Sequence, residues 1–228
     1  MEIINSYDKL PLGMYLEIMD LCEDKSLEED DRQMEIISIL SGKSVDELLK
    51  MPILDFKRLS AQTKFLEEDY PRTKRKPPKE FHFEEMTLKV TTDITKMTTA
   101  QYVDYQTFSE MGKEKVVELL SVFFIPKGMD YNEGYDVKDV QDVLRRRLSV
   151  GEALSLSAFF LTKFLRLMEA TLIYSRLMLK RAKETERKTE LMEQINHLQM
   201  ALQGSGDGWT LSCALWKLPM RGGLKYGR

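Results

Sequence analysis

Histidine, cysteine and tryptophan are nearly absent from this sequence of 228 residues, which contains two of each. His82 and His197 lie far apart in unrelated contexts, so a histidine metal cluster or a Ser-His-Asp triad would have to use one of them without a recognisable motif. Cys22 and Cys213 form neither a CxxC pair nor a disulfide framework. The cysteine content therefore favours a reducing compartment.

A nucleotide-binding loop is also missing. The run Ser41-Gly42-Lys43-Ser44 resembles the end of a phosphate loop, but Ile37 stands where that loop requires its first glycine. Paired acidic residues, as in 67–69, have no apolar surroundings that would raise a carboxyl pKa for acid–base catalysis. The sequence therefore predicts a protein that is not an enzyme and that binds no cofactor or metal.

Every long apolar run in the sequence contains charged residues. Residues 153–179 are rich in Leu, Phe, Met and Ala, but Lys163, Arg166 and Glu169 interrupt them and would be costly in hydrocarbon. The net charge of −3 gives no general attraction to nucleic acid or to an anionic membrane. With 43% hydrophobic and 31% charged residues, the composition is that of a soluble globular protein, and we expect no membrane partner.

The sequence does contain clear helix boundaries. Ser44, Thr98 and Ser149 each precede Glu or Gln by three positions, which is the pattern of a capping box at a helix start. Gly42 is a candidate left-handed helix end. Apolar and polar residues alternate around 81–91, which predicts a small β-hairpin. We therefore predict a mainly α-helical fold with this hairpin as its strand element.

Three sequence blocks recur in the same order in the two halves. Residues 10–21 align with 97–108, residues 35–40 with 118–123, and residues 51–56 with 148–153, so that Tyr15 corresponds to Tyr102. The pattern indicates one helical unit used twice, with both tyrosines buried. The alternative is that amphipathic helices resemble one another through composition alone.

The predicted organisation has five parts. A helical unit over 1–70 is followed by a basic, proline-rich linker and the hairpin over 71–92, and then by a related unit over 93–155. A long helix over 156–203, either single or bent into two, precedes a flexible tail over 204–228 that contains glycine and tryptophan. Within the long helix, apolar residues at alternating three- and four-residue steps are joined by others that widen the face, which predicts packing on more than one side.

An apolar stripe resumes after the charged stretch 180–190 and continues towards the tail. Exposed stripes and aromatic anchors of this kind typically bind a partner. A tail that folds back on its own domain is the alternative. The candidate partner-binding residues are Leu191, Ile195, Leu198, Leu202, Trp209 and Trp216.

Three segments resemble a known group of proteins. They are residues 8–18 (DKLPLGMYLEI), 31–42 (DRQMEIISILSG) and 91–102 (TTDITKMTTAQY). They resemble small helical accessory proteins of tailed bacteriophages, most of all those of crAss-like and other Bacteroidales phages. The resemblance covers residues 7–165, and its motifs are non-catalytic.

This resemblance implies a virion-associated or assembly protein. Such a protein acts by binding, either packaged in the particle as cargo or structural component, or as a tail assembly chaperone. Its partners would be other virion or tail proteins, and a homo-oligomer is compatible with this role. Its location would be the virion, or the host cytoplasm during assembly.

Two basic clusters support an alternative function, that of a packaged protein associated with nucleic acid through patches 72–79 and 145–147. Neither cluster has the interleaved aromatic residues of a single-strand binding groove, so a linker and a helix end are the favoured interpretations. The candidate phosphate contacts are Arg72, Lys74, Arg75, Lys76, Arg145, Arg146 and Arg147.

Overall fold

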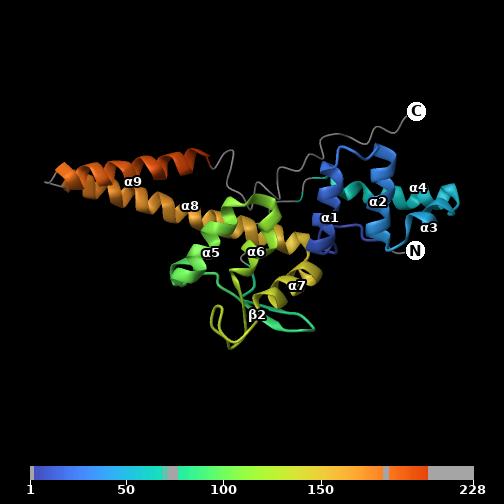
Figure 1. The fold of residues 1–228 in the computed structure, drawn as a ribbon, viewed down its shortest axis with the longest axis horizontal. Helices are drawn as coiled ribbons and strands as arrows, with labels where there is room; N and C mark the ends of the chain where they lie inside the picture. The colour runs from blue at the N-terminus through green and yellow to red at the C-terminus, as the bar shows by residue number, and fades with distance from the viewer. Residues whose placement is uncertain (1–2, 69, 71–76, 182–184, 205–228) are drawn as a thin grey trace.

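The computed structural model describes residues 3–68, 70, 77–181 and 185–204, and these residues are mainly helical, as the sequence predicted (Figure 1). The first part of the chain contains α1 (Leu12–Glu23), α2 (Glu29–Ser41), α3 (Val45–Leu49), α4 (Ile53–Gln62) and the 3-10 helix η1 (Thr63–Glu67). The middle part contains β1 (Glu80–His82), β2 (Thr87–Val90), η2 (Ile94–Lys96), α5 (Thr99–Glu110), η3 (Gly112–Lys115), α6 (Val116–Ser121), β3 (Phe124–Pro126) and α7 (Val137–Arg147). Two long helices follow, α8 (Val150–Arg181) and α9 (Thr185–Gly204).

The predicted helix boundaries are confirmed. The Ser44 hydroxyl accepts the backbone N–H of Glu47 at 3.3 Å, and the Glu47 carboxylate accepts the backbone N–H of Ser44 at 2.8 Å. Gly42 ends α2 in the left-handed conformation, with φ of 66°. The same reciprocal capping pairs start α5 and α8, between Thr98 and Gln101 and between Ser149 and Glu152.

The predicted hairpin is also present, as part of a larger sheet. Strands β1 and β2 pair antiparallel, with Phe81 opposite Leu88. The sequence analysis missed β3, which pairs antiparallel with the other edge of β2 and places Pro126 opposite Leu88. β2 is therefore the central strand, and Leu88 and Val90 lie on its buried face while Lys89 between them is exposed.

The predicted duplication is wrong. Tyr15 in α1 is 1% exposed, whereas Tyr102 in α5 is 48% exposed. In α5 the buried tyrosine is Tyr105, one turn later, whose ring stacks on Phe164 of α8 with the centroids 4.2 Å apart. The second block, residues 118–123, also ends in a turn, whereas its counterpart 35–40 lies wholly within α2. The repeated blocks therefore reflect similar amphipathic composition and not one fold used twice.

The prediction of a long helix over 156–203 also needs correction. Helix α8 begins at Val150, inside the predicted second unit, and the chain then reverses so that α9 packs along α8 (Figure 1). Leu172 and Ser175 of α8 and Ile195 of α9 are buried. The two apolar stripes therefore cover each other in a helical hairpin, the two-helix alternative of the sequence analysis.

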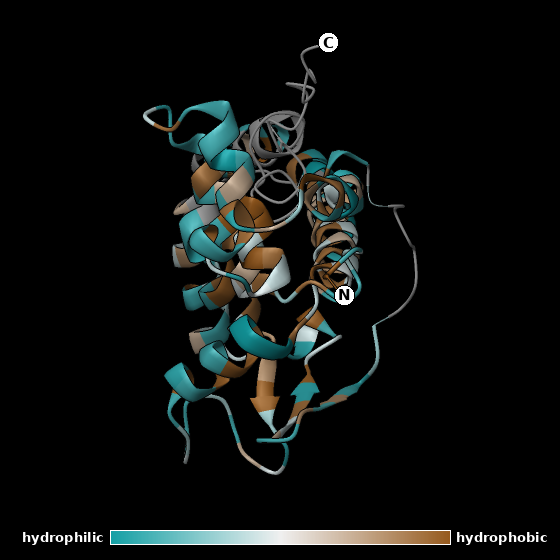
Figure 2. Cartoon of the chain, turned by 90° about the vertical axis from the view of Figure 1, so that its right-hand side faces the viewer, coloured by the Kyte–Doolittle hydropathy of each residue, from teal (hydrophilic) through white to brown (hydrophobic). Residues whose placement is uncertain are grey.

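The two predicted units share one hydrophobic core. The backbone N–H of Leu12 donates to the Leu148 carbonyl at 2.8 Å, and the N–H of Val150 donates to the Leu10 carbonyl at 2.8 Å. Buried residues form a continuous cluster from Ile3 to Phe164. Viewed along the molecule, apolar segments of the helices lie towards the interior and hydrophilic ones towards the outside (Figure 2).

Gly13 lets α1 approach α7 closely. A Cβ added there would lie 2.7 Å from Cγ of Arg145 and 2.9 Å from the Arg145 carbonyl oxygen. A side chain can rotate away from such a clash, but a helical carbonyl cannot without a shift of the backbone.

We therefore expect Gly13→Ala to destabilise the protein by about 1–3 kcal/mol through overpacking, although alanine is the better helix former by about 1 kcal/mol. Denaturant unfolding followed by circular dichroism measures this effect. Glu17→Ala, on the exposed side of the same helix, is the control and should change the free energy of unfolding by less than about 0.5 kcal/mol. A Gly13→Ala variant as stable as the control would contradict the close contact.

Candidate functional site

The basic residues predicted to contact phosphate divide into two groups. Arg72, Lys74, Arg75 and Lys76 lie outside the described residues. Arg145, Arg146 and Arg147 form the last turn of α7. Positive charge at this end of a helix interacts favourably with the helix dipole.

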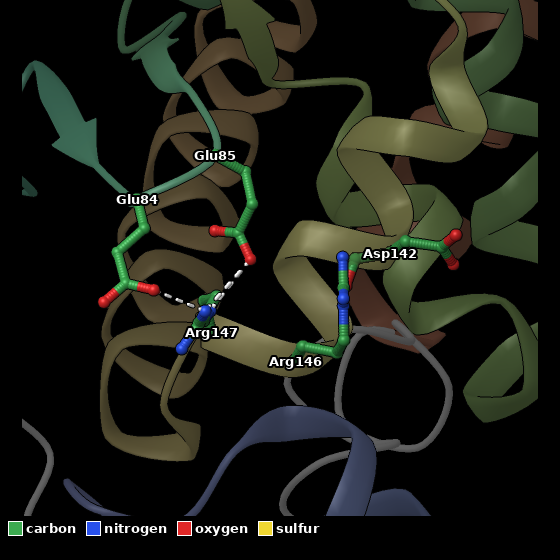
Figure 3. A network of polar contacts seen from close by, with 5 residues as sticks. All are labelled: Glu84, Glu85, Asp142, Arg146 and Arg147. Carbon is green, nitrogen blue, oxygen red and sulfur yellow. Dashed lines mark hydrogen bonds and ion pairs between the residues drawn. The ribbon is translucent and has the colours of Figure 1, made fainter.

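Arg147 is engaged by the β1–β2 turn. Its guanidinium lies 2.7 Å from the Glu84 carboxylate and 3.1 Å from the Glu85 carboxylate (Figure 3). Arg146 donates through Nε to the Asp142 carbonyl of its own helix at 3.3 Å. The cluster is therefore partly neutralised, and Arg147 connects the sheet to α7.

This contact perturbs both partners. The pKa of Glu85 is held below its ordinary value by a hydrogen bond from its own backbone N–H and then by Arg147. The pKa of Arg147 is raised by Glu85 and Glu84. Both effects favour the ionised pair at neutral pH.

The predicted partner-binding stripe is closed where the structure describes it. Ile195 is 8% exposed, so it is covered within the chain and the expected open stripe is wrong at this position. Leu191 is half-buried. The side chains of Leu198, Leu202, Trp209 and Trp216 lie outside the described residues.

Two other apolar surfaces are open, and the sequence analysis missed the first. The α3–α4 patch consists of Leu49, Ile53 and Leu54, which are 68%, 65% and 68% exposed. The chain turns sharply through Pro52, which caps α4, so these side chains point outward while Leu48 and other residues of the same helices are buried. Clustered, exposed aliphatic side chains are a recognised mark of an interaction site.

The second open surface is the outer face of α8, formed by Leu167, Ala170, Ile173, Tyr174 and Leu177. Its four large side chains are 42% to 62% exposed, although α9 packs on the same helix. The sequence predicted packing on more than one side of this helix, and α9 covers one side only. Figure 1 places this hairpin and the α3–α4 patch at opposite ends of the molecule's long axis.

Within residues 3–68, 70, 77–181 and 185–204, no group of three or more His, Cys, Asp and Glu side chains is arranged to hold a metal ion. Burial raises the pKa of Tyr15, so its hydroxyl stays protonated at neutral pH.

Among the same residues, no helix has the length and apolarity required to cross a membrane.

Comparison with known protein families, with curated protein sequences and with solved structures finds no match to this chain.

The Arg147 contact gives a prediction about acid titration. We expect Arg147→Gln to move the pKa of Glu85 upward, towards the ordinary carboxyl value of about 4.3. Because the folded pKa is lowered, the contact stabilises the fold above that value, and its contribution is lost as the pH falls through the lowered pKa. Carboxyl carbon NMR titration measures the shift.

Arg146→Gln is the matched control, since Arg146 is adjacent and acts on Glu85 only weakly, through charge. It should move the Glu85 titration much less. Equal shifts in the two variants would mean that Glu85 responds to the general positive charge of α7 and not to the Arg147 contact.

Proposed function

We propose that this chain is a non-enzymatic bacteriophage protein that works by binding other virion or tail components. The observation that carries the proposal is the α3–α4 patch, an open apolar surface at the end of the molecule opposite the α8–α9 hairpin (Figure 1). The phage assignment is supported by the sequence resemblance over residues 7–165. The protein acts as a packaged or structural component of the particle, or as a tail assembly chaperone.

The α3–α4 patch is suited to binding because its backbone is already ordered. The capping box at Ser44 fixes the start of α3, and Leu48 and Leu59 anchor the two short helices, each being 2% exposed. Ile53 and Leu54 follow in the first turn of α4, four and five residues after Leu49, and all three side chains are largely exposed. A preformed surface loses less conformational entropy on binding than a flexible segment does.

We expect the triple variant Leu49→Gln, Ile53→Gln and Leu54→Gln to lower association with the phage partner by about tenfold or more, because it removes most of the apolar area of the patch. Incorporation into purified virions, or co-purification with tail proteins from infected cells, measures the loss. The melting temperature should hardly change, because all three side chains are already largely in water.

Two controls separate binding from folding. Met129→Gln replaces an exposed apolar side chain elsewhere and should leave association unchanged. Leu48→Ala removes a buried neighbour and should cost about 2–5 kcal/mol of stability. A triple variant that associates like the wild type would exclude this patch.

Mass spectrometry of purified virions and of infected cells tests the proposed role itself. A defined copy number in the virion fits a structural or cargo protein, and presence in infected cells without retention in the virion fits a chaperone. Salt-sensitive DNA binding that is lost when the basic residues 72–79 and 145–147 become alanine would favour the nucleic-acid alternative instead. Hydrolase activity abolished by one point mutation would contradict both.

A further inference from the structure

The two long sides of α8 differ in what covers them. The inner side, which includes Leu172 and Ser175, is buried in the hairpin with α9. The outer face repeats the same three- and four-residue spacing through Ala170, Ile173 and Leu177, yet Ile173 is 58% exposed and Leu177 is 49% exposed. Such spacing is the seam of a helix that packs against another helix.

We propose that the outer face of α8 pairs with the outer face of α8 in a second copy of this chain, antiparallel and across a two-fold axis. Two helical hairpins joined in this way form a layer of four helices, in which each α8 is covered by its own α9 on one side and by the other copy's α8 on the other. This inference concerns self-association and does not depend on the phage role.

The charges beside the seam are self-complementary. Glu169 and Arg176 lie on the same flank, seven residues or about two helical turns apart, and both are exposed. When two identical helices pack antiparallel, like flanks face each other. Glu169 of each copy then lies opposite Arg176 of the other, which gives two reciprocal ion pairs from one pair of residues.

The same alignment matches the apolar side chains. On the opposite flank, Leu167 and Tyr174 are also seven residues apart, and each would face the other in the second copy. In the seam, Ala170 would lie against Ile173 of the second copy, a small residue against a large one, which favours close interdigitation. One register therefore satisfies both flanks and the central Ala170–Ile173 contacts of the seam.

Basic residues lie at the two ends of the seam. Lys163 and Lys180 are exposed and would approach each other across the axis. Their long stems allow both ammonium groups to reach water, so this repulsion is screened while the central pairs form.

The placement of the charges argues for a second copy rather than the C-terminal segment of the same chain. Residues 205–228 contain four basic residues and one acidic residue, Asp207. The surface around the outer face of α8 has the same balance, with Glu169 among Lys163, Arg166, Arg176 and Lys180, so position and not net charge separates the two occupants. A second copy supplies Glu169 opposite Arg176, whereas the C-terminal segment supplies one carboxylate close to its start.

Charge reversal in the full-length protein tests this arrangement. Glu169→Arg and Arg176→Glu should each weaken self-association by roughly tenfold, because each converts two attractions into two repulsions. When the two variants are mixed, they should form a heterodimer, since every Arg then faces a Glu. Analytical ultracentrifugation in the micromolar range measures both effects against the chain mass of 26.6 kDa.

Two further variants complete the test. Glu17→Arg makes the same charge change on α1 and should leave self-association unchanged. Ile173→Asp should abolish it, with helix content by circular dichroism as the check on folding. The proposal is overturned if the wild type is monomeric at every concentration tested. The outer face of α8 would then be covered by residues 205–228 or by a different protein. The proposal is also overturned if the single reversals have no effect, or if the mixed variants fail to associate.

Discussion

One short stretch of backbone pairing, between residues 10–12 and residues 148–150, joins the first part of the chain to α8. Leu12 and Val150 each donate their N–H across it at 2.8 Å, so the start of α1, the end of α7 and the start of α8 meet at one place. Gly151 is required beside it, because a Cβ there would collide with the Asp8 carboxylate and would lie 2.8 Å from the Tyr70 hydroxyl. Together with the packing of α1 on α7, this junction sets the orientation of the α1–α4 part of the chain relative to the long hairpin.

Beyond that junction, stacked aromatic rings attach α8 to the rest of the fold. The ring of Phe160 stacks on Phe123 with centroids 3.8 Å apart, and Phe164 stacks on Tyr105 at 4.2 Å. Helix α8 contains 32 residues and is about 48 Å long, so a large part of it continues past Phe164. This distal part relies on α9 for its packing, since two helices alone cannot enclose a core on all sides. The exposed side chains on the outer face of α8 follow directly from this geometry.

The features that could be predicted from the sequence are those determined within a few residues. Capping boxes, the left-handed Gly42 and the hairpin at 81–91 each depend on neighbouring positions, and each is present. The sequence could not show which faces of the helices pack against one another. Tyr15 and Tyr102 follow the same local pattern, but only Tyr15 faces the shared core, because α5 turns Tyr105 towards Phe164 instead. Strand β3 is three residues long and exists through its pairing with β2, a contact between distant positions. The α3–α4 patch was missed for the same reason: its apolar residues look like core residues until their exposure is known.

The arrangement of the open surfaces constrains the kind of binding the protein can perform. A flexible tether would place two binding segments at variable separation, and its contribution would fall with linker length. Here the α3–α4 patch and the hairpin are joined through one continuous core, and the Arg147 contact with Glu84 and Glu85 ties the sheet to the same helices. Their separation is therefore set by the fold. If the outer faces of two α8 helices pair as proposed, the two-fold axis passes between the two hairpins and each copy presents its α3–α4 patch away from that axis. The dimer would then offer two identical apolar patches at a fixed spacing, which is a geometry suited to joining repeated subunits of a larger assembly.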